Sequence, residues 1–121
     1  MLILLMLIIN QGLNNYAEAF VNFDVNSIVS MYNFPCEIVH NGVSANFTED
    51  SFRDNIEKLC GIYRDFGLSN AIYNIILCNE GCARVGWILK KNEMIFSEFT
   101  CEYYFDDDYN VYLVKNFDEK L

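Results

Sequence analysis

The second half of the chain most constrains its fold, because four strand-like segments follow one another there with only short turns between them. The segments cover 69–78, 82–90, 94–105 and 110–116, and their residues are rich in β-branched and aromatic side chains. Connections this short join antiparallel strands, since parallel strands need a long crossover. This half therefore predicts an antiparallel sheet built from consecutive hairpins.

The first half carries helical signals instead. Two stripes of apolar residues step by four, three, four and three, which places each stripe on one face of a helix: Ile9, Leu13, Tyr16, Phe20 and Phe23 in the first, and Phe52, Ile56, Leu59, Tyr63 and Phe66 in the second. A short helix is expected at 25–32, ended by Pro35, and strands at 36–40 and 43–47 around an Asn41-Gly42 turn. Thr48 is suited to cap the third helix, and Gly67 to end it.

The order of helices and strands predicts an α+β fold in which three N-terminal helices pack in a strongly curved antiparallel sheet. A length of 121 residues suits one domain over 1–121. Residues 1–8 are either an apolar N-terminal extension or the start of helix one, since so short an apolar run cannot span a bilayer. A sheet that curls around a long helix leaves a cavity, which is a natural small-molecule site.

The net charge and the cysteine content limit the kinds of binding partner and the cellular compartment that we expect. Eight basic against seventeen acidic residues give a formal net charge of −9, which opposes binding to nucleic acid or to an anionic membrane. Five cysteines, an odd number without zinc-type spacing, predict reduced thiols, a cytoplasmic location and no metal site. A solvated turn is expected at Asp106-Asp107-Asp108, because the ligand spacing of a calcium loop is missing. No cofactor motif occurs in the sequence.

An ordered set of short segments resembles the nuclear transport factor 2-like superfamily, which includes ketosteroid isomerase, scytalone dehydratase and the SnoaL-like polyketide cyclases. The segments are Tyr16-Ala-Glu-Ala-Phe-Val-Asn-Phe-Asp24, Asn26-Ser-Ile-Val-Ser-Met-Tyr32, Thr48-Glu-Asp-Ser-Phe52, Tyr63-Arg-Asp-Phe-Gly67, Trp87 and Tyr103. The resemblance covers about residues 9–117 and implies a cone-shaped fold. It does not imply one chemistry, because this fold carries enzymes, carriers and interaction modules.

The resemblance also suggests catalytic candidates. Tyr16 falls where ketosteroid isomerase has its oxyanion-binding tyrosine, and His40 falls where that enzyme has its general base. The second oxyanion donor matches Cys101, a weak donor, so steroid isomerisation is not expected. His40 and Tyr16 could still serve a cofactor-independent isomerase, cyclase or dehydratase. The alternative is an ordinary strand-end histidine and a core tyrosine.

The main expectation is a SnoaL-like domain that binds a small apolar or aromatic molecule in the cone, without established catalysis. The residues expected to line the pocket are Tyr63, Tyr73, Trp87, Phe99, Cys101 and Tyr103. A homodimer is expected through the outer sheet face, which should include Phe96 and Tyr104. The rival from another class is a protein-interaction module whose cone is filled with side chains.

Overall fold

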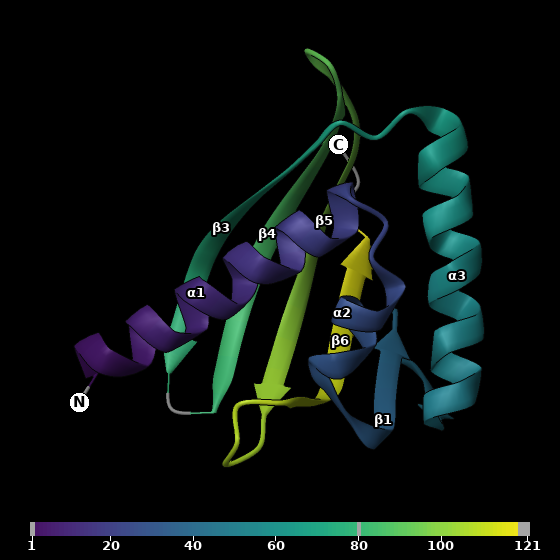
Figure 1. Ribbon diagram of the computed structural model, residues 1–121. Coiled ribbons are helices and arrows are strands. Elements are labelled where there is room, and N and C mark those ends of the chain that lie inside the picture. The colour runs from purple at the N-terminus through teal and green to yellow at the C-terminus, as the bar shows by residue number, and fades with distance from the viewer. Residues whose placement is uncertain (1, 80, 119–121) are drawn as a thin grey trace.

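The architecture is that of three helices lying against one face of a curved six-stranded sheet (Figure 1). A computed structural model describes residues 2–79 and 81–118. The helices are α1 (Leu2–Val21), α2 (Val25–Ser30) and α3 (Glu49–Phe66). The strands are β1 (Tyr32–His40), β2 (Val43–Phe47), β3 (Asn70–Asn79), β4 (Cys82–Lys91), β5 (Met94–Phe105) and β6 (Val111–Asp118). The α+β class and the four-strand meander predicted from the sequence are confirmed.

The strand order is β2-β1-β6-β5-β4-β3, and one pairing departs from the antiparallel expectation. Strand β1 runs parallel to β6, whereas the other four pairs are antiparallel. A tight hairpin imposes antiparallel pairing, but β1 and β6 are joined by most of the chain, so no turn fixes their relative direction. This pairing brings the short first hairpin onto the meander and forms one continuous concave wall.

Local sequence explains where α3 begins and ends. The Thr48 hydroxyl accepts a hydrogen bond from the Ser51 backbone N–H, while the Ser51 hydroxyl accepts one from the Thr48 N–H, which together make a capping box. At the other end Gly67 has a φ of 86°, a left-handed conformation that glycine adopts without strain. The apolar stripe between these ends buries Phe52, Ile56 and Cys60.

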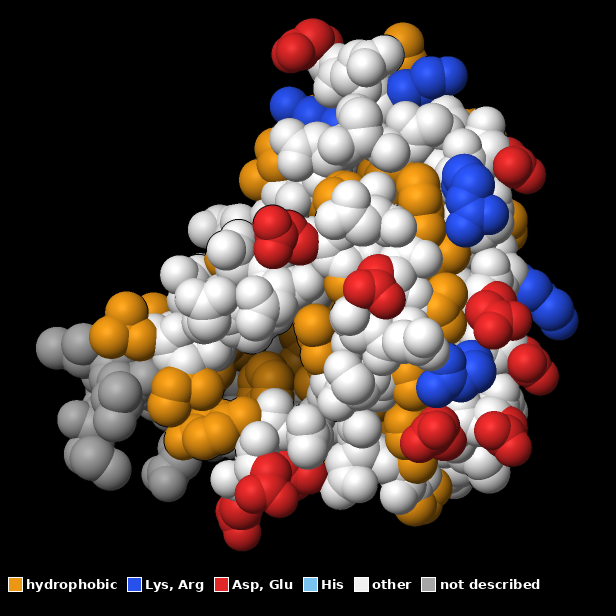
Figure 2. Space-filling view, viewed as in Figure 1, with side chains coloured by type: hydrophobic (Ala, Val, Ile, Leu, Met, Phe, Trp, Pro, Cys, Tyr) orange, Lys and Arg blue, Asp and Glu red, His pale blue; other side chains and the backbone are white. Residues whose placement is uncertain are grey.

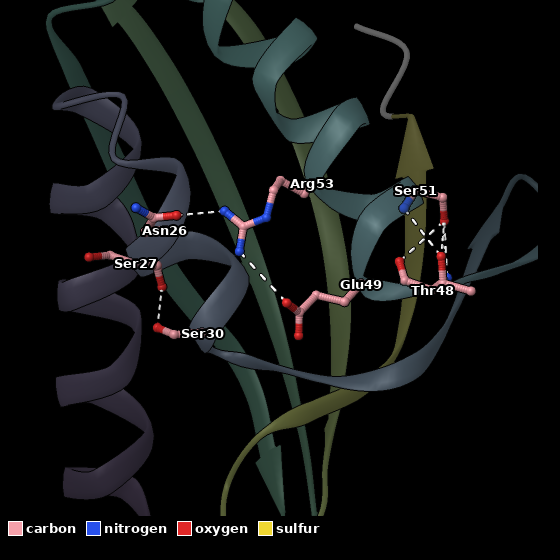
Figure 3. A network of polar contacts seen from close by, with 7 residues as sticks. All are labelled: Asn26, Ser27, Ser30, Thr48, Glu49, Ser51 and Arg53. Atoms are coloured by element: carbon pink, nitrogen blue, oxygen red, sulfur yellow. Dashed lines mark hydrogen bonds and ion pairs between the residues drawn. The ribbon is translucent and has the colours of Figure 1, made fainter.

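Polar contacts hold the N-terminal end of α3 beside α2 (Figure 3). The Arg53 guanidinium donates to the side-chain oxygen of Asn26 on α2 and lies 3.8 Å from the Glu49 carboxylate. Such exposed pairs contribute little energy individually. The Arg53–Asn26 contact does link the N-terminal part of α3 to α2.

Two local expectations from the sequence are wrong. Strand β1 begins at Tyr32 rather than at Cys36, because α2 ends early at Ser30 and the chain becomes extended well before Pro35. Phe96 does not face outward: a register shift in the β4–β5 pairing leaves it between Ile95 and Ser97, and its ring lies 6.0 Å from that of Tyr63 on α3.

The apolar residues at the start of the chain belong to α1 from Leu2 onward. Met6 and Leu7 in this part of the helix are exposed, whereas Ile9 and Leu13 are buried against the core. Within residues 2–79 and 81–118, no helix is both long and apolar enough to cross a membrane.

Candidate functional site

A cavity of about 360 Å³ lies between the concave face of the sheet and the helices α1 and α3. Helices α1 and α3 and every strand except β2 contribute to its wall. The wall consists of Tyr16, Phe20, Tyr32, Ile38, Phe52, Ile56, Leu59, Tyr63, Ala71, Trp87, Leu89, Ser97, Glu98, Phe99, Cys101, Tyr103, Val114 and Asn116. Eight of these residues are aromatic, and none is basic. The cavity is within the size range of small-molecule sites, about 300–1,000 Å³.

Two hydrogen-bonded aromatic pairs form the deep part of the wall. The hydroxyl oxygens of Tyr16 and Tyr32 are 2.7 Å apart, and the indole N–H of Trp87 donates to the Tyr103 hydroxyl at 2.8 Å. Burial raises the pKa values of Tyr16, Tyr32 and Tyr103 above the usual 10.0. All three tyrosines therefore remain neutral at physiological pH.

Cys101 lies in the same wall, and its thiol is mostly protonated at neutral pH. Burial raises the pKa of its thiol from 9.0 to about 12. The thiolate is the reactive form of cysteine, so this side chain does not act as a nucleophile at neutral pH. Its role in the wall is that of a small apolar group.

The structure places most of the sequence-predicted residues in this wall. Tyr16 lies there, as do Tyr63, Trp87, Phe99, Cys101 and Tyr103. Tyr73 does not line the cavity. Its hydroxyl donates to the side-chain oxygen of Asn10 at 2.7 Å, so its ring packs between α1 and Trp87.

His40 is not brought onto the cavity with Tyr16. On β1 the lining ends at Ile38, and His40 is the exposed last residue of the strand, next to the turn. Its Nε2 lies 3.4 Å from the side-chain nitrogen of Asn41. The structure therefore does not place His40 in the wall with Tyr16, and spacing along the chain could not show how far the wall extends along β1.

Several lining residues were not singled out from the sequence. Phe52, Ile56 and Leu59 belong to the apolar stripe of α3, and they also form one side of the cavity. Asn116 lies two residues after Val114 on β6, so both side chains face the cavity. A polar residue in phase with apolar ones on the last strand is a pattern that the sequence alone could have shown. The Oδ1 atom of Asn116 is shielded from solvent and has no hydrogen-bond partner within the described residues.

A second cavity of about 340 Å³ lies beneath the middle of α1, from Ile8 to Tyr16. Figure 2 shows it as a hollow under this helix with hydrophobic side chains inside. Tyr16 and Tyr103 belong to the walls of both cavities, so the two cavities adjoin at these residues.

Solved structures with this arrangement include a SnoaL-like protein of unknown function from Burkholderia thailandensis. It matches with a TM-score of 0.73 at 13% identity, covering 92% of this chain and 94% of that one. A nuclear transport factor 2-like protein of unknown function from Shewanella oneidensis matches with a TM-score of 0.62 at 21% identity, covering 91% and 96%. No family model and no curated protein matches the sequence.

A de novo designed protein with a curved β-sheet has the same arrangement, with a TM-score of 0.70 at 7% identity over 92% of this chain and 84% of that one. The chain thus has the cone fold of the nuclear transport factor 2-like superfamily, as the sequence resemblance indicated. The fold leaves the chemistry open, because natural and designed chains share it.

Proposed function

We propose that this protein is a binding protein that takes a small apolar or aromatic molecule into the first cavity of the cone. The observation that carries the proposal is the open volume of about 360 Å³ at the place where an interaction module would be filled with side chains. Trp87, Phe99 and Tyr103, which would fill such a cone, stand at its wall.

The wall chemistry supports a neutral ring or apolar group as the ligand. Aromatic rings gain from offset or edge-to-face contact with other rings in addition to the burial of their surface. The hydroxyls of Tyr16 and Tyr32 bond to each other, so they need no ligand group. An anionic ligand would meet no basic side chain in the wall.

The alternative of a cofactor-independent acid/base enzyme receives less support. Tyr16 borders the cavity and stays protonated, as an oxyanion donor must. The histidine expected as the base is not in place, since His40 lies outside the lining, and the only carboxylate among the lining residues is that of Glu98. A general base must reach the proton that it abstracts.

Calorimetric titration with 2-naphthol tests the proposal. We expect saturable binding to the wild type, and loss of it in Ala71→Phe, which puts a ring into the cavity from β3. Ala45→Phe is the matched control, because Ala45 is an exposed strand residue outside the lining. Absence of binding to the wild type, or equal binding to the Ala71→Phe variant, would contradict the proposal.

The proposal includes a homodimer formed through the outer face of the sheet. Ile72 and Ile76 on β3 are 40% and 57% exposed, and Tyr104 on β5 lies under the Lys115 ammonium group. Light scattering should give twice the 14.1 kDa mass of the chain, and Ile72→Arg should lower it. A wild-type mass of one chain at micromolar concentration would refute the dimer.

The buried thiols support the proposed cytoplasmic location. Burial raises the pKa of Cys36 to about 11, and Cys60 is buried as well. Thiols of this kind suit a reducing compartment.

A further inference from the structure

The second cavity has no role in the proposed function. Its roof is the middle of α1, from Ile8 to Tyr16, and its floor and sides come from the end of α2, the end of β5, the start of β6 and the turn between these strands. The lining consists of Ile8, Ile9, Gln11, Gly12, Leu13, Asn15, Tyr16, Ser30, Met31, Tyr103, Phe105, Tyr109, Asn110 and Val111. With about 340 Å³ it is nearly as large as the first cavity, and it forms the hollow seen under α1 in Figure 2.

Gly12 stands in the middle of this roof. Glycine in a helix interior costs stability relative to alanine, so a physical reason for its presence is needed. Its backbone is helical, and a Cβ added to it would meet no atom within 4 Å. Neither conformation nor crowding requires glycine here. Because Ile8 and Tyr16 lie one turn to either side of it on the same helix face, the missing side chain leaves space in the cavity.

The cavity wall is apolar, with amide groups among its polar members and no charged residue. The loop from Asp106 to Asp108 adjoins it, because Phe105 and Tyr109 on either side of this loop belong to the lining. The Asp106 carboxylate accepts from the backbone N–H groups of Asp108 and Asn110, whereas the side chains of Asp107 and Asp108 are exposed.

This combination favours one class of ligand. Apolar walls accept a hydrocarbon body, and negative charge on the adjoining loop attracts a positive head group and repels an anionic one. A fatty acid or another carboxylate would place its charge next to the aspartates. An amine would place its ammonium group there favourably.

We propose that the cavity beneath α1 is a second binding site, which takes a small amphiphilic amine with its apolar part under Gly12 and its ammonium group beside Asp107 and Asp108. The site adjoins the first cavity, but the two linings share only Tyr16 and Tyr103. It does not depend on the function proposed for the first cavity.

The experiment is an NMR titration of the ¹⁵N-labelled protein with octylammonium below its micellar concentration. We expect saturable shifts at the amides of Gly12, Leu13, Asn110 and Val111. Octanoate has the same chain with the opposite charge and should bind at least about tenfold more weakly. Shifts confined to Trp87 and Phe99, no saturable shift, or equal affinity for octanoate would each overturn the proposal.

Filling the site provides the second test. Gly12→Phe should weaken octylammonium binding at least about tenfold, while Gly61→Phe should not. Gly61 is the matched control, since it too lies within a helix, has no atom within 4 Å of an added Cβ, and belongs to neither lining. If Gly12→Phe does not fold, Gly12→Leu carries the same expectation. Unchanged affinity in a folded Gly12 variant would overturn the proposal, as would unchanged affinity in the double variant Asp107→Asn, Asp108→Asn.

Discussion

The hydrogen bond between Tyr16 and Tyr32 gives a quantitative test of how the cavity wall is held. Tyr32 is only 8% exposed, and its hydroxyl lies 2.7 Å from that of Tyr16. In Tyr16→Phe the Tyr32 hydroxyl stays in the wall without this partner, and an unsatisfied buried group costs about 1–3 kcal/mol. We expect a loss near 2 kcal/mol in the free energy of unfolding, within that ~1–3 kcal/mol range.

Tyr32→Phe should cost less, about 1 kcal/mol, because the Tyr16 side chain left without its partner is less buried than Tyr32. The double variant removes both hydroxyls and therefore leaves neither of them without a hydrogen-bond partner. It should therefore be destabilised by about 1 kcal/mol, well below the sum of the single effects.

Urea unfolding followed by circular dichroism measures these values. Tyr112→Phe is the control, because Tyr112 is 44% exposed, and its change should stay within about 0.5 kcal/mol. Additive effects of the two substitutions, to within about 0.5 kcal/mol, would show that the two hydroxyls are not coupled and would refute the reasoning.

Three further predictions concern stability. Thr48→Ala removes the capping bond to Ser51 and should cost about 1 kcal/mol in urea unfolding, most of which Thr48→Ser should restore; no loss would refute the capping role. Gly67→Ala forces a φ of 86° on a residue with a Cβ and should lower the melting temperature, which calorimetry measures, whereas an unchanged value would contradict the assigned conformation. Unfolding lets Cys36 and Cys101 return from pKa values of about 11 and 12 to 9.0, and the buried tyrosines return to 10.0. Because these folded-state pKa values are raised, stability should be fully present below pH 9.0 and fall as the pH rises above it, by up to about 1.4 kcal/mol per pH unit for each titrating group; a flat profile between pH 9.0 and about 11 would refute this.

The sequence predicted the parts of the fold that local chemistry decides. Turn residues set the hairpins of the meander, and the apolar stripe with Thr48 and Gly67 at its ends set α3. The parallel pairing of β1 with β6 could not be predicted in this way, because it depends on contacts between distant segments. Phe96 was misplaced for a related reason: one extra residue in a strand reverses which side chains face inward.

The candidate site was predictable to the extent that residue type and strand parity decide it. Trp87, Phe99 and Tyr103 share the inner face of the meander and line the cavity. The alternation of side chains along a strand did not show that Tyr73 makes a hydrogen bond to Asn10, or that the cavity wall ends before His40. Both depend on how the strands meet the helices and one another in space. The second cavity arises partly from a missing side chain at Gly12, which no pattern of apolar residues reveals.

Xenon binding measured by NMR tests most directly whether the cone is open. Xenon enters apolar cavities that side chains leave unfilled. We expect saturable shifts at the methyl groups of Ile56, Leu59 and Val114, which line the first cavity. Ala71→Phe should suppress these shifts, and Ala45→Phe should leave them unchanged. A wild-type spectrum in which these methyl groups do not respond to xenon would show a filled cone and contradict the proposed binding function.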